Sequence, residues 1–295
     1  MTSPTQPPRA PRVGVAIATR DRCAELAAVL ERLRALPERP PVVVADNGSR
    51  DGTPARIRAR FPDVRVLELG ENRGAGARTA AVEALATPDV AFSDDDSWWA
   101  PGALTRAADL LDAHAGVALV AARVVLGLDE RIDPMCERML KSPLGALAGT
   151  WPFVLGFIAC GAVVRRAPFL DVGGFREPCR IGGEEELVAL DLASRGWSLV
   201  YAHEVIAHHH PSALRNRTAR RRDLLRNRLR TAWLRRPIGP ALRETCCVVR
   251  RGIREQEARG ALMDVALESP RLAGGRRVVP QDVELQLARL AEGGS

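Results

Sequence analysis

Three consecutive aspartates, Asp94-Asp95-Asp96, are the residues of this sequence best suited to chemistry. They follow a short apolar run that ends at Phe92 and is typical of a buried strand. They precede Pro101, where a helix can begin. In open α/β sheets, ligands bind beyond the carboxyl ends of the strands. Alternate carboxylates of an extended D-x-D segment can converge on one divalent cation, which prefers oxygen ligands. The alternative is an acidic turn whose aspartate caps the helix, and this segment alone leaves both open.

The composition is typical of a soluble globular protein. The chain has 295 residues, of which 46% are apolar and 27% charged, enough for one large α/β domain with an appendage or for two domains. The formal net charge is +7, and Lys141 is the only lysine. Arginine binds phosphate through two parallel hydrogen bonds, so the excess suits anionic ligands or an anionic membrane surface. An Ala-, Arg-, Gly- and Pro-rich coding bias explains much of the same excess.

The six cysteines form no C-x-x-C pair and show no metal-ligand spacing. Adjacent Cys246 and Cys247 are poor candidates for a disulfide framework, so we expect reduced and mostly buried cysteines in a cytosolic protein. The first twelve residues are polar and rich in proline, without the apolar core of a signal peptide. No run is long and apolar enough to cross a bilayer.

Apolar runs and helical segments alternate over about the first 120 residues, after a tail at 1–11 that we predict to be disordered. Buried strands are predicted at 13–18, 42–45, 64–69 and 89–92, with helices at 23–36, 54–60, 77–85 and 101–114. This alternation is the signature of right-handed βαβ units and a mainly parallel sheet. Asp46 follows the second strand as the three aspartates follow the fourth, so a nucleotide site across these strand ends follows from the topology.

The pattern loosens after residue 117. Strands are predicted at 117–126, 157–164, 197–202 and 205–210, a short helix at 167–172, and a further helix that opens with Glu184-Glu185-Glu186 and ends at Ser194. Residues 129–150 are irregular, and a loop of that length inside a compact domain is usually functional or mobile. Three histidines, at 208–210, end the last predicted strand.

The residues from 214 onward are mostly helical and strongly basic. Ten arginines fall between 215 and 236, around an apolar stripe of Leu224, Leu225, Leu229, Trp233 and Leu234. Such a helix either packs on the preceding α/β domain with its charges in water or lies on a membrane surface. Helix-turn-helix, zinc-finger and aromatic RNA-platform patterns are absent from the sequence, so we expect no nucleic-acid partner.

Several stretches together resemble the family 2 glycosyltransferases with the GT-A fold. The resemblance lies in the opening strand and turn (13–22), the second-strand motif (44–53), the N-x-G loop (Asn72-Arg73-Gly74), the D-x-D region (92–96), the G-G-F and E-D stretches (173–175 and 183–185) and a late histidine (208–210). It spans about residues 12–235. The motifs are weak singly and specific in this order and spacing.

The resemblance implies an α/β protein with a GT-A domain at 12–212 and a basic helical extension at 213–295. Within the domain, 12–120 form the nucleotide-binding half and 121–212 the acceptor half. It also implies an inverting enzyme that moves a sugar from a nucleoside diphosphate sugar to a glycan, lipid-linked or small-molecule acceptor. A Q-x-x-R-W stretch, typical of processive synthases, is absent from the sequence, which favours single-sugar transfer. We expect a cytoplasmic protein, with peripheral contact to the inner face of the membrane left open.

The resemblance assigns roles to individual residues. Nucleotide-binding candidates are Thr19, Arg20, Arg22, Asp46, Asn72, Arg73, Gly74, Asp94 and Asp95; Asp94, Asp96, His208 and His210 are the candidate ligands of Mn²⁺ or Mg²⁺. Such a cation neutralises charge that builds on the leaving diphosphate. Glu185 aligns with the aspartate of the E-D pair and is the candidate base, with Glu184 as the alternative. Glutamate departs from the family pattern here, and acids at a helix start are also favoured by the helix dipole alone.

Two other functions are compatible with parts of the sequence. A sugar-nucleotide pyrophosphorylase needs a glycine-rich first loop to grip a triphosphate, and residues 18–22 lack those glycines. A nucleotide-binding or membrane-associated scaffold without catalysis would not need acids at both the D-x-D and the E-D positions. The sequence therefore favours the transferase.

Overall fold

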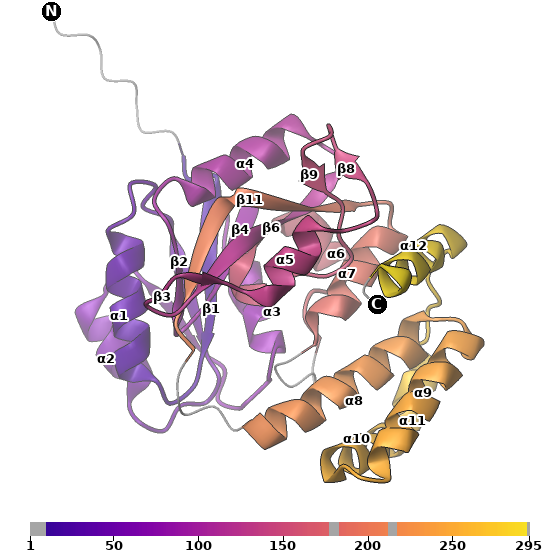
Figure 1. Ribbon diagram of the computed structural model, residues 1–295. Helices are drawn as coiled ribbons and strands as arrows, with labels where there is room; N and C mark the ends of the chain where they lie inside the picture. Colours follow the sequence, from indigo (N-terminus) through magenta and orange to yellow (C-terminus); the bar gives the residue numbers. More distant parts are fainter. Residues whose placement is uncertain (1–9, 177–182, 212–216, 294–295) are drawn as a thin grey trace, which may run out of the picture.

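The computed structural model describes residues 10–176, 183–211 and 217–293, and its core is a nine-stranded mixed sheet (Figure 1). The strand order is β3-β2-β1-β4-β10-β6-β11-β5, and β7 (Arg131–Ile132) pairs with β6. The predicted mainly parallel α/β architecture is therefore confirmed. The tail predicted at 1–11 falls mostly on residues outside the described part, as do Cys179 and Arg215.

The first half of the chain is a set of parallel strands joined by helices. The strands are β1 (Val13–Thr19), β2 (Val42–Asp46), β3 (Arg65–Glu68) and β4 (Asp89–Asp94), and the helices α1 (Cys23–Arg34), α2 (Thr53–Arg60), α3 (Gly76–Glu83) and α4 (Ala103–Ala113). In the register of the sheet, Thr19 pairs with Asp46 on one side, and Ala18 pairs with Asp94 on the other. The parallel pairing thus places the polar ends of β1, β2 and β4 at one edge.

The second half extends the sheet with strands of both directions. The strand β10 (Ala162–Arg165) runs antiparallel between β4 and β6 (Val117–Leu126). Next to β6 lies β11 (Ser198–His209), which is one irregular strand where the sequence predicted two. The short strand β5 (Ser97–Trp99) was not predicted; it pairs Ser97 with His209 and so brings the end of β11 to the three aspartates.

Shorter elements connect these strands along the chain. They are α5 (Pro134–Leu140), β8 (Ala146–Leu147), β9 (Trp151–Pro152), the 3₁₀ turn η1 (Ala159–Gly161), α6 (Arg166–Asp171) and α7 (Glu185–Ser194). The segment predicted as irregular at 129–150 therefore contains a helix, which Asp133 caps by accepting the N–H of Met135.

The G-G-F stretch joins α3 to α6. Gly174 has φ +56°, and a Cβ there would lie 2.6 Å from the hydroxyl of Thr79 on α3, so only glycine fits. Phe175 packs edge-on against Phe92 of β4 and Phe169 of α6, with ring centroids 5.3 and 5.4 Å away. This packing fixes α3 beside the chain that leads to α7.

The predicted helical C-terminal extension is present as α8 (Arg217–Arg235), α9 (Ile238–Gly252), α10 (Gln256–Leu267), α11 (Ser269–Gly275) and α12 (Gln281–Glu292). Helices α8 to α11 lie together on one side of the sheet domain (Figure 1). Leu225 and Leu229 of α8 pack with Val248, Ala261 and neighbours in a second apolar cluster, which also takes in Leu187 of α7. None of the described helices is long and apolar enough to cross a membrane.

Candidate active site

The polar edge of the sheet begins with the ends of β1 and β2. Thr19 and Asp46 are both buried there. Asp46 Oδ2 accepts the N–H of Ser49 at 2.9 Å, whereas Asp46 Oδ1 is buried without a hydrogen-bond partner among the described residues. A buried carboxylate oxygen without a donor costs free energy unless a ligand supplies one. Asp46 is therefore positioned to accept a hydrogen bond from a bound molecule.

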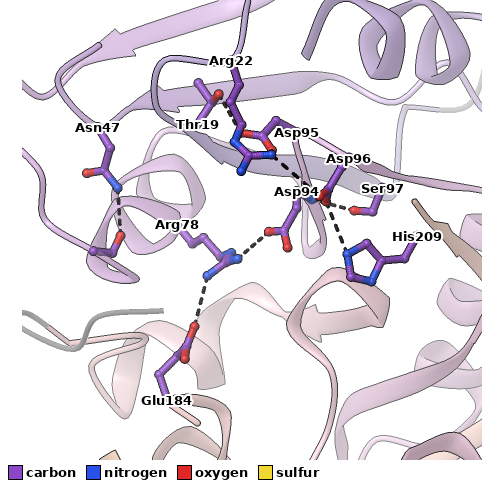
Figure 2. A network of polar contacts seen from close by, with 11 residues as sticks. Thr19, Arg22, Asn47, Arg78, Asp94, Asp95, Asp96, Ser97, Glu184 and His209 are labelled. Carbon is purple, nitrogen blue, oxygen red and sulfur yellow. Dashed lines mark hydrogen bonds and ion pairs between the residues drawn. The ribbon is translucent and has the colours of Figure 1, made fainter. Parts of the chain in front are cut away.

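Asp94 is the last residue of β4, and Asp95 and Asp96 form the tight turn that leads to β5 (Figure 2). The N–H of Asp94 donates to Ser97 Oγ at 2.7 Å and closes the turn. Asp95 accepts from Thr19 Oγ1 at 3.0 Å, and Arg22 Nη1 lies 3.6 Å from its other oxygen. Burial, with the nearby charge of Asp94, raises the pKa of Asp95 to about 7 against the opposing effect of Arg22. Arg22 also lies 4.0 Å from Asp96, so one cation serves two of the acids.

Arg78 of α3 is a central residue of the site that sequence reasoning missed. It is fully buried, and its guanidinium donates to Asp94 Oδ1 and, at 3.3 Å, to Glu184 Oε1 (Figure 2). Burial acts to lower the pKa of Arg78, but the charges of Asp94 and Glu184 outweigh it and raise that pKa further above its ordinary value. A permanent cation therefore bridges the D-x-D and E-D stretches.

The two candidate bases differ in their surroundings. Glu184 is buried and held by Arg78, whereas Glu185 is only partly buried at the first turn of α7 and accepts the N–H of Gly183 at 3.1 Å. A carboxylate engaged by a buried arginine is a poorer proton acceptor than one that reaches solvent. The structure thus places Glu184 at the aspartates through Arg78, with Glu185 next to it in the chain.

Asn47 is a second residue that sequence reasoning missed. Its side chain accepts the N–H of Arg73 at 2.8 Å and donates to the carbonyl of Gly74 at 3.0 Å, so it binds the N-x-G loop to the end of β2 (Figure 2). Asn72 also stays within the loop, where its side chain accepts the N–H of Gly74. The D-N-G sequence around Asn47 is ordinary turn chemistry, and only the tertiary contact distinguishes it.

The structure does not bring every predicted residue to the acids. Arg20 is exposed and turned to Asp21, with 3.6 Å between Nε and Oδ2. Arg73 Nε lies 3.6 Å from Glu71 Oε1 on the rim of the loop. Each of these two side chains thus lies beside an acid of its own loop.

The histidines differ most from the prediction. His208 and His210 pack against Trp98, with ring centroids 5.3 and 4.6 Å from it, and burial lowers the pKa of His208. His209 faces the acids instead, with Nε2 3.4 Å from Asp96 Oδ1. Successive strand residues point to opposite faces, so the histidine between the two predicted ligands is the one that reaches the site. The structure therefore brings the His209 side chain, rather than those of His208 and His210, to the acids.

One group of side chains has the spacing of a metal site. A carboxylate oxygen of Asp94, Sγ of Cys160 and a ring nitrogen of His209 lie within 4.8 Å of one another. Asp96 adjoins the group through His209. Carboxylate oxygens are the ligands that Mn²⁺ and Mg²⁺ prefer, whereas the imidazole and the thiol are softer donors. Cys160, which comes from η1, carried no sequence signal because its partners are distant in the chain.

Comparisons with known proteins identify the family and the fold. Residues 14–173, more than half of the chain, match the family model described as "Glycosyl transferase family 2". A Mycobacterium tuberculosis protein named N-acetylglucosaminyl-diphospho-decaprenol L-rhamnosyltransferase is 29% identical over 210 residues, which cover 59% of this chain and 67% of that protein.

Two solved structures resemble the fold. One is the mannosyltransferase PcManGT from Pyrobaculum calidifontis in complex with GDP-Man and Mn²⁺, with a TM-score of 0.61 and 21% identity over 97% of this chain and 87% of that one. The other is S. aureus TarS 1–349 in complex with UDP-GlcNAc, with a TM-score of 0.60 and 16% identity over 75% and 65% of the two chains. The predicted GT-A fold is thereby confirmed.

Proposed function

Because the chain belongs to glycosyl transferase family 2 and is a glycosyltransferase, we propose that it moves one sugar, with inversion, from a nucleoside diphosphate sugar to an acceptor hydroxyl. The observation that carries the proposal is the set of acids at the end of β4, gathered between the cations of Arg22 and Arg78. Carboxylates can bind a divalent cation, and the guanidinium groups beside them can offset the negative charge. Such a set suits a site that holds a diphosphate together with a metal ion.

The donor nucleotide is proposed to lie over the ends of β1 and β2. Asp46 Oδ1, buried without a described partner, accepts a hydrogen bond from the base or the ribose. The loop of Asn72, Arg73 and Gly74, held by Asn47, forms the rim beside it. Arg22 is near enough to the aspartates to contact the diphosphate. PcManGT and TarS, both in complex with a nucleotide sugar, support a donor of this class.

A divalent cation is proposed at Asp94, Asp96 and His209, with Cys160 beside them. The residues fit such an ion, because carboxylate oxygens and one imidazole converge at the buried end of the strand. When bound, the cation supplies Lewis-acid stabilisation of charge on the leaving diphosphate. Arg78 holds the Asp94 carboxylate in place by donating a hydrogen bond to Oδ1. The Mn²⁺ in PcManGT favours manganese without excluding magnesium.

Glu185 is proposed as the base. Its carboxylate takes the proton of the acceptor hydroxyl as that oxygen attacks the anomeric carbon, and the diphosphate leaves from the opposite face. Direct displacement of this kind inverts the anomeric configuration. Glu184 remains bound to Arg78 and keeps the first turn of α7 against the metal-binding edge.

The acceptor is proposed to be a sugar linked through a diphosphate to a lipid, since the mycobacterial relative is named for such a substrate. A free glycan or a small molecule is the alternative. A lipid-linked acceptor places the enzyme at the cytoplasmic side of a membrane, which is the location we propose.

Purified full-length protein with Mn²⁺ and a panel of UDP, GDP and dTDP sugars tests the proposal. We expect one donor to release its nucleoside diphosphate, and the anomeric proton of the product, read by NMR with a synthetic lipid-diphosphate acceptor, to show inversion. Retention of configuration would contradict the displacement by Glu185. If the protein hydrolyses none of the donors faster than they hydrolyse in buffer alone, the catalytic function is overturned and a nucleotide-binding scaffold is left.

A further inference from the structure

The outer face of helix α9 carries a row of exposed aliphatic side chains. Ile238, Leu242, Val249 and Ile253, which follows the helix directly, are exposed to 62%, 49%, 49% and 75%. Their spacings of four, seven and four residues return to the same side of a helix with 3.6 residues per turn. Scattered apolar residues are common on surfaces, but an aligned row of four marks an interaction site.

The neighbouring sector of the same helix is basic. Arg243, Arg250 and Arg254 lie there, all exposed, and their side chains make no ion pair or hydrogen bond with any residue that the structure describes. The opposite side of the helix is buried, where Ala241 and Val248 pack inward. Because that packing sets the rotation of α9, the apolar row and the arginines both face outward together.

Helix α8, the basic helix singled out by sequence, differs in this respect. Arg222 binds Asp264 at 2.6 Å and Arg228 binds Glu244 at 2.8 Å. Arg230 likewise lies 3.1 Å from Glu268. These positive charges are neutralised by α9, α10 and the residue that follows α10. Helix α9 therefore differs from these parts of α8 in that its exposed arginines are not neutralised by described residues.

We propose that this face of α9 docks on an anionic lipid bilayer. Ile238, Leu242, Val249 and Ile253 enter the boundary between head groups and acyl chains, and Arg243, Arg250 and Arg254 meet the lipid phosphates. A bilayer presents an apolar layer and an anionic layer side by side, which matches the two parallel sectors. A second copy of the chain would instead set arginines near arginines across a two-fold axis.

The position of α9 links this docking to the proposed function. This link rests on the proposed function, whereas the docking itself does not. Helix α8 packs on α9, and its residues Leu224 and Asn227 lie next to Gly183, within 4 Å of where a Cβ would stand. Gly183 in turn precedes Glu184 and the proposed base. A docked α9 thus holds the base loop near the bilayer surface, where a lipid-linked acceptor would lie.

Co-sedimentation of the full chain with phosphatidylcholine vesicles, with and without phosphatidylglycerol, tests the inference. We expect binding only with phosphatidylglycerol. The triple variant Arg243→Gln/Arg250→Gln/Arg254→Gln should bind roughly a hundredfold more weakly, at about fivefold per arginine. The matched control Arg34→Gln/Arg56→Gln/Arg138→Gln removes equal charge from exposed arginines elsewhere and should bind like the wild type.

A second pair of variants tests the apolar row. Leu242→Ser/Ile253→Ser should lose most of the vesicle binding, whereas Leu128→Ser/Leu140→Ser, which removes leucines exposed to 90% and 52% in the catalytic domain, should keep it. If the wild type does not bind anionic vesicles, the inference is overturned. That result is expected if the partner of this face is an acidic protein. Equal losses in the control variants overturn it as well.

Donor hydrolysis measured without vesicles separates this inference from the proposed function. The α9 variants should hydrolyse the donor at the wild-type rate, because the helix lies outside the nucleotide site. Vesicle binding by a wild-type protein without hydrolysis would refute only the catalytic proposal. Hydrolysis without vesicle binding would refute only the docking.

Discussion

Strand β4 begins and ends with aspartate, and its two ends have different chemistry. Asp89, at the start, is buried, and burial raises its pKa to about 6 despite the charge of Arg165. Its nearby arginines are engaged elsewhere: Arg165 donates to the backbone carbonyl of Val117, and Arg12 binds Asp109 and Asp112. At the other end, carboxylates, two arginines, a histidine and a thiol converge from six elements or loops.

The comparison shows that a raised carboxyl pKa does not by itself identify a functional site. Both Asp89 and Asp95 have raised pKa values, and desolvation is the main cause for each. They differ in their neighbours. Asp95 lies among groups that can act jointly on one ligand, whereas the arginines near Asp89, at the other end of the strand, are bound to other partners. Convergence of several groups is therefore the better criterion.

The largest effect that would sharpen this comparison is expected from Asp96→Asn. Loss of one charged ligand should lower metal-dependent donor hydrolysis roughly a thousandfold, because Lewis-acid stabilisation weakens. The melting temperature should change little, since the amide is isosteric with the carboxylate. Unchanged turnover would remove Asp96, and with it the cation, from the proposed site.

The next effect concerns the base. Glu185→Gln should slow transfer to the acceptor roughly a hundredfold or more, the usual loss for a general base, while donor binding measured by calorimetry stays within a few-fold of wild type. Glu184→Gln, in contrast, removes a partner of buried Arg78 and should lower the thermal stability as well. Transfer at the full rate in Glu185→Gln would move the base to another group.

Cys160 should give a spectroscopic effect rather than a large kinetic one. With Co²⁺, the wild type should show a sulfur-to-metal charge-transfer band in the near ultraviolet, and Cys160→Ser should abolish it. Mn²⁺-dependent hydrolysis should change only a few-fold, because manganese prefers the oxygen ligands. Cys136→Ser, which alters a buried thiol bonded to the backbone around Val124, is the control and should keep the band. A band that survives Cys160→Ser would exclude the thiol as a ligand.

The smallest effect belongs to the other end of the strand. The folded protein holds the proton of Asp89 up to about pH 6, whereas the unfolded chain loses it near pH 4, so stability falls between about pH 4 and 6. The free energy of unfolding of Asp89→Asn should therefore exceed that of the wild type by about 1–2 kcal/mol at pH 7, and the two should be equal at pH 4. Chemical denaturation at the two pH values measures this. A loss of donor hydrolysis in this variant would contradict the view that only the Asp94 end of β4 is functional.

The sequence was sufficient for the parallel half of the fold, because buried parallel strands appear as continuous apolar runs such as Val13–Ala18. It was insufficient where geometry depends on a partner strand. Ser97–Trp99 is too short to stand out beside three aspartates, and it becomes a strand only because β11 pairs with it. The same pairing decides which histidine of 208–210 faces the acids, and strand periodicity alone leaves that face open.

Charge pairs between residues far apart in the chain were the second feature that could not be predicted from the sequence. Arg78 lies in an Ala-rich helix that resembles many surface helices, and only the fold reveals that Asp94 and Glu184 surround it. The arginines of α8 were equally ambiguous, because Asp264 and Glu244, their partners, lie 42 and 16 residues away along the chain. Composition predicts that a helix is basic but does not predict whether its charge is already compensated.

The place of β10 in the sheet has a consequence for how the chain folds. Residues 162–165 form a central strand between β4 and β6, although both neighbours precede them in the sequence. During synthesis, β4 and β6 must therefore wait with open edges until the ribosome has released β10, and β11 closes β6 later still. Such late, non-local closure slows folding and leaves aggregation-prone edges exposed. Chaperone capture of nascent chains should accordingly peak before residue 165 emerges.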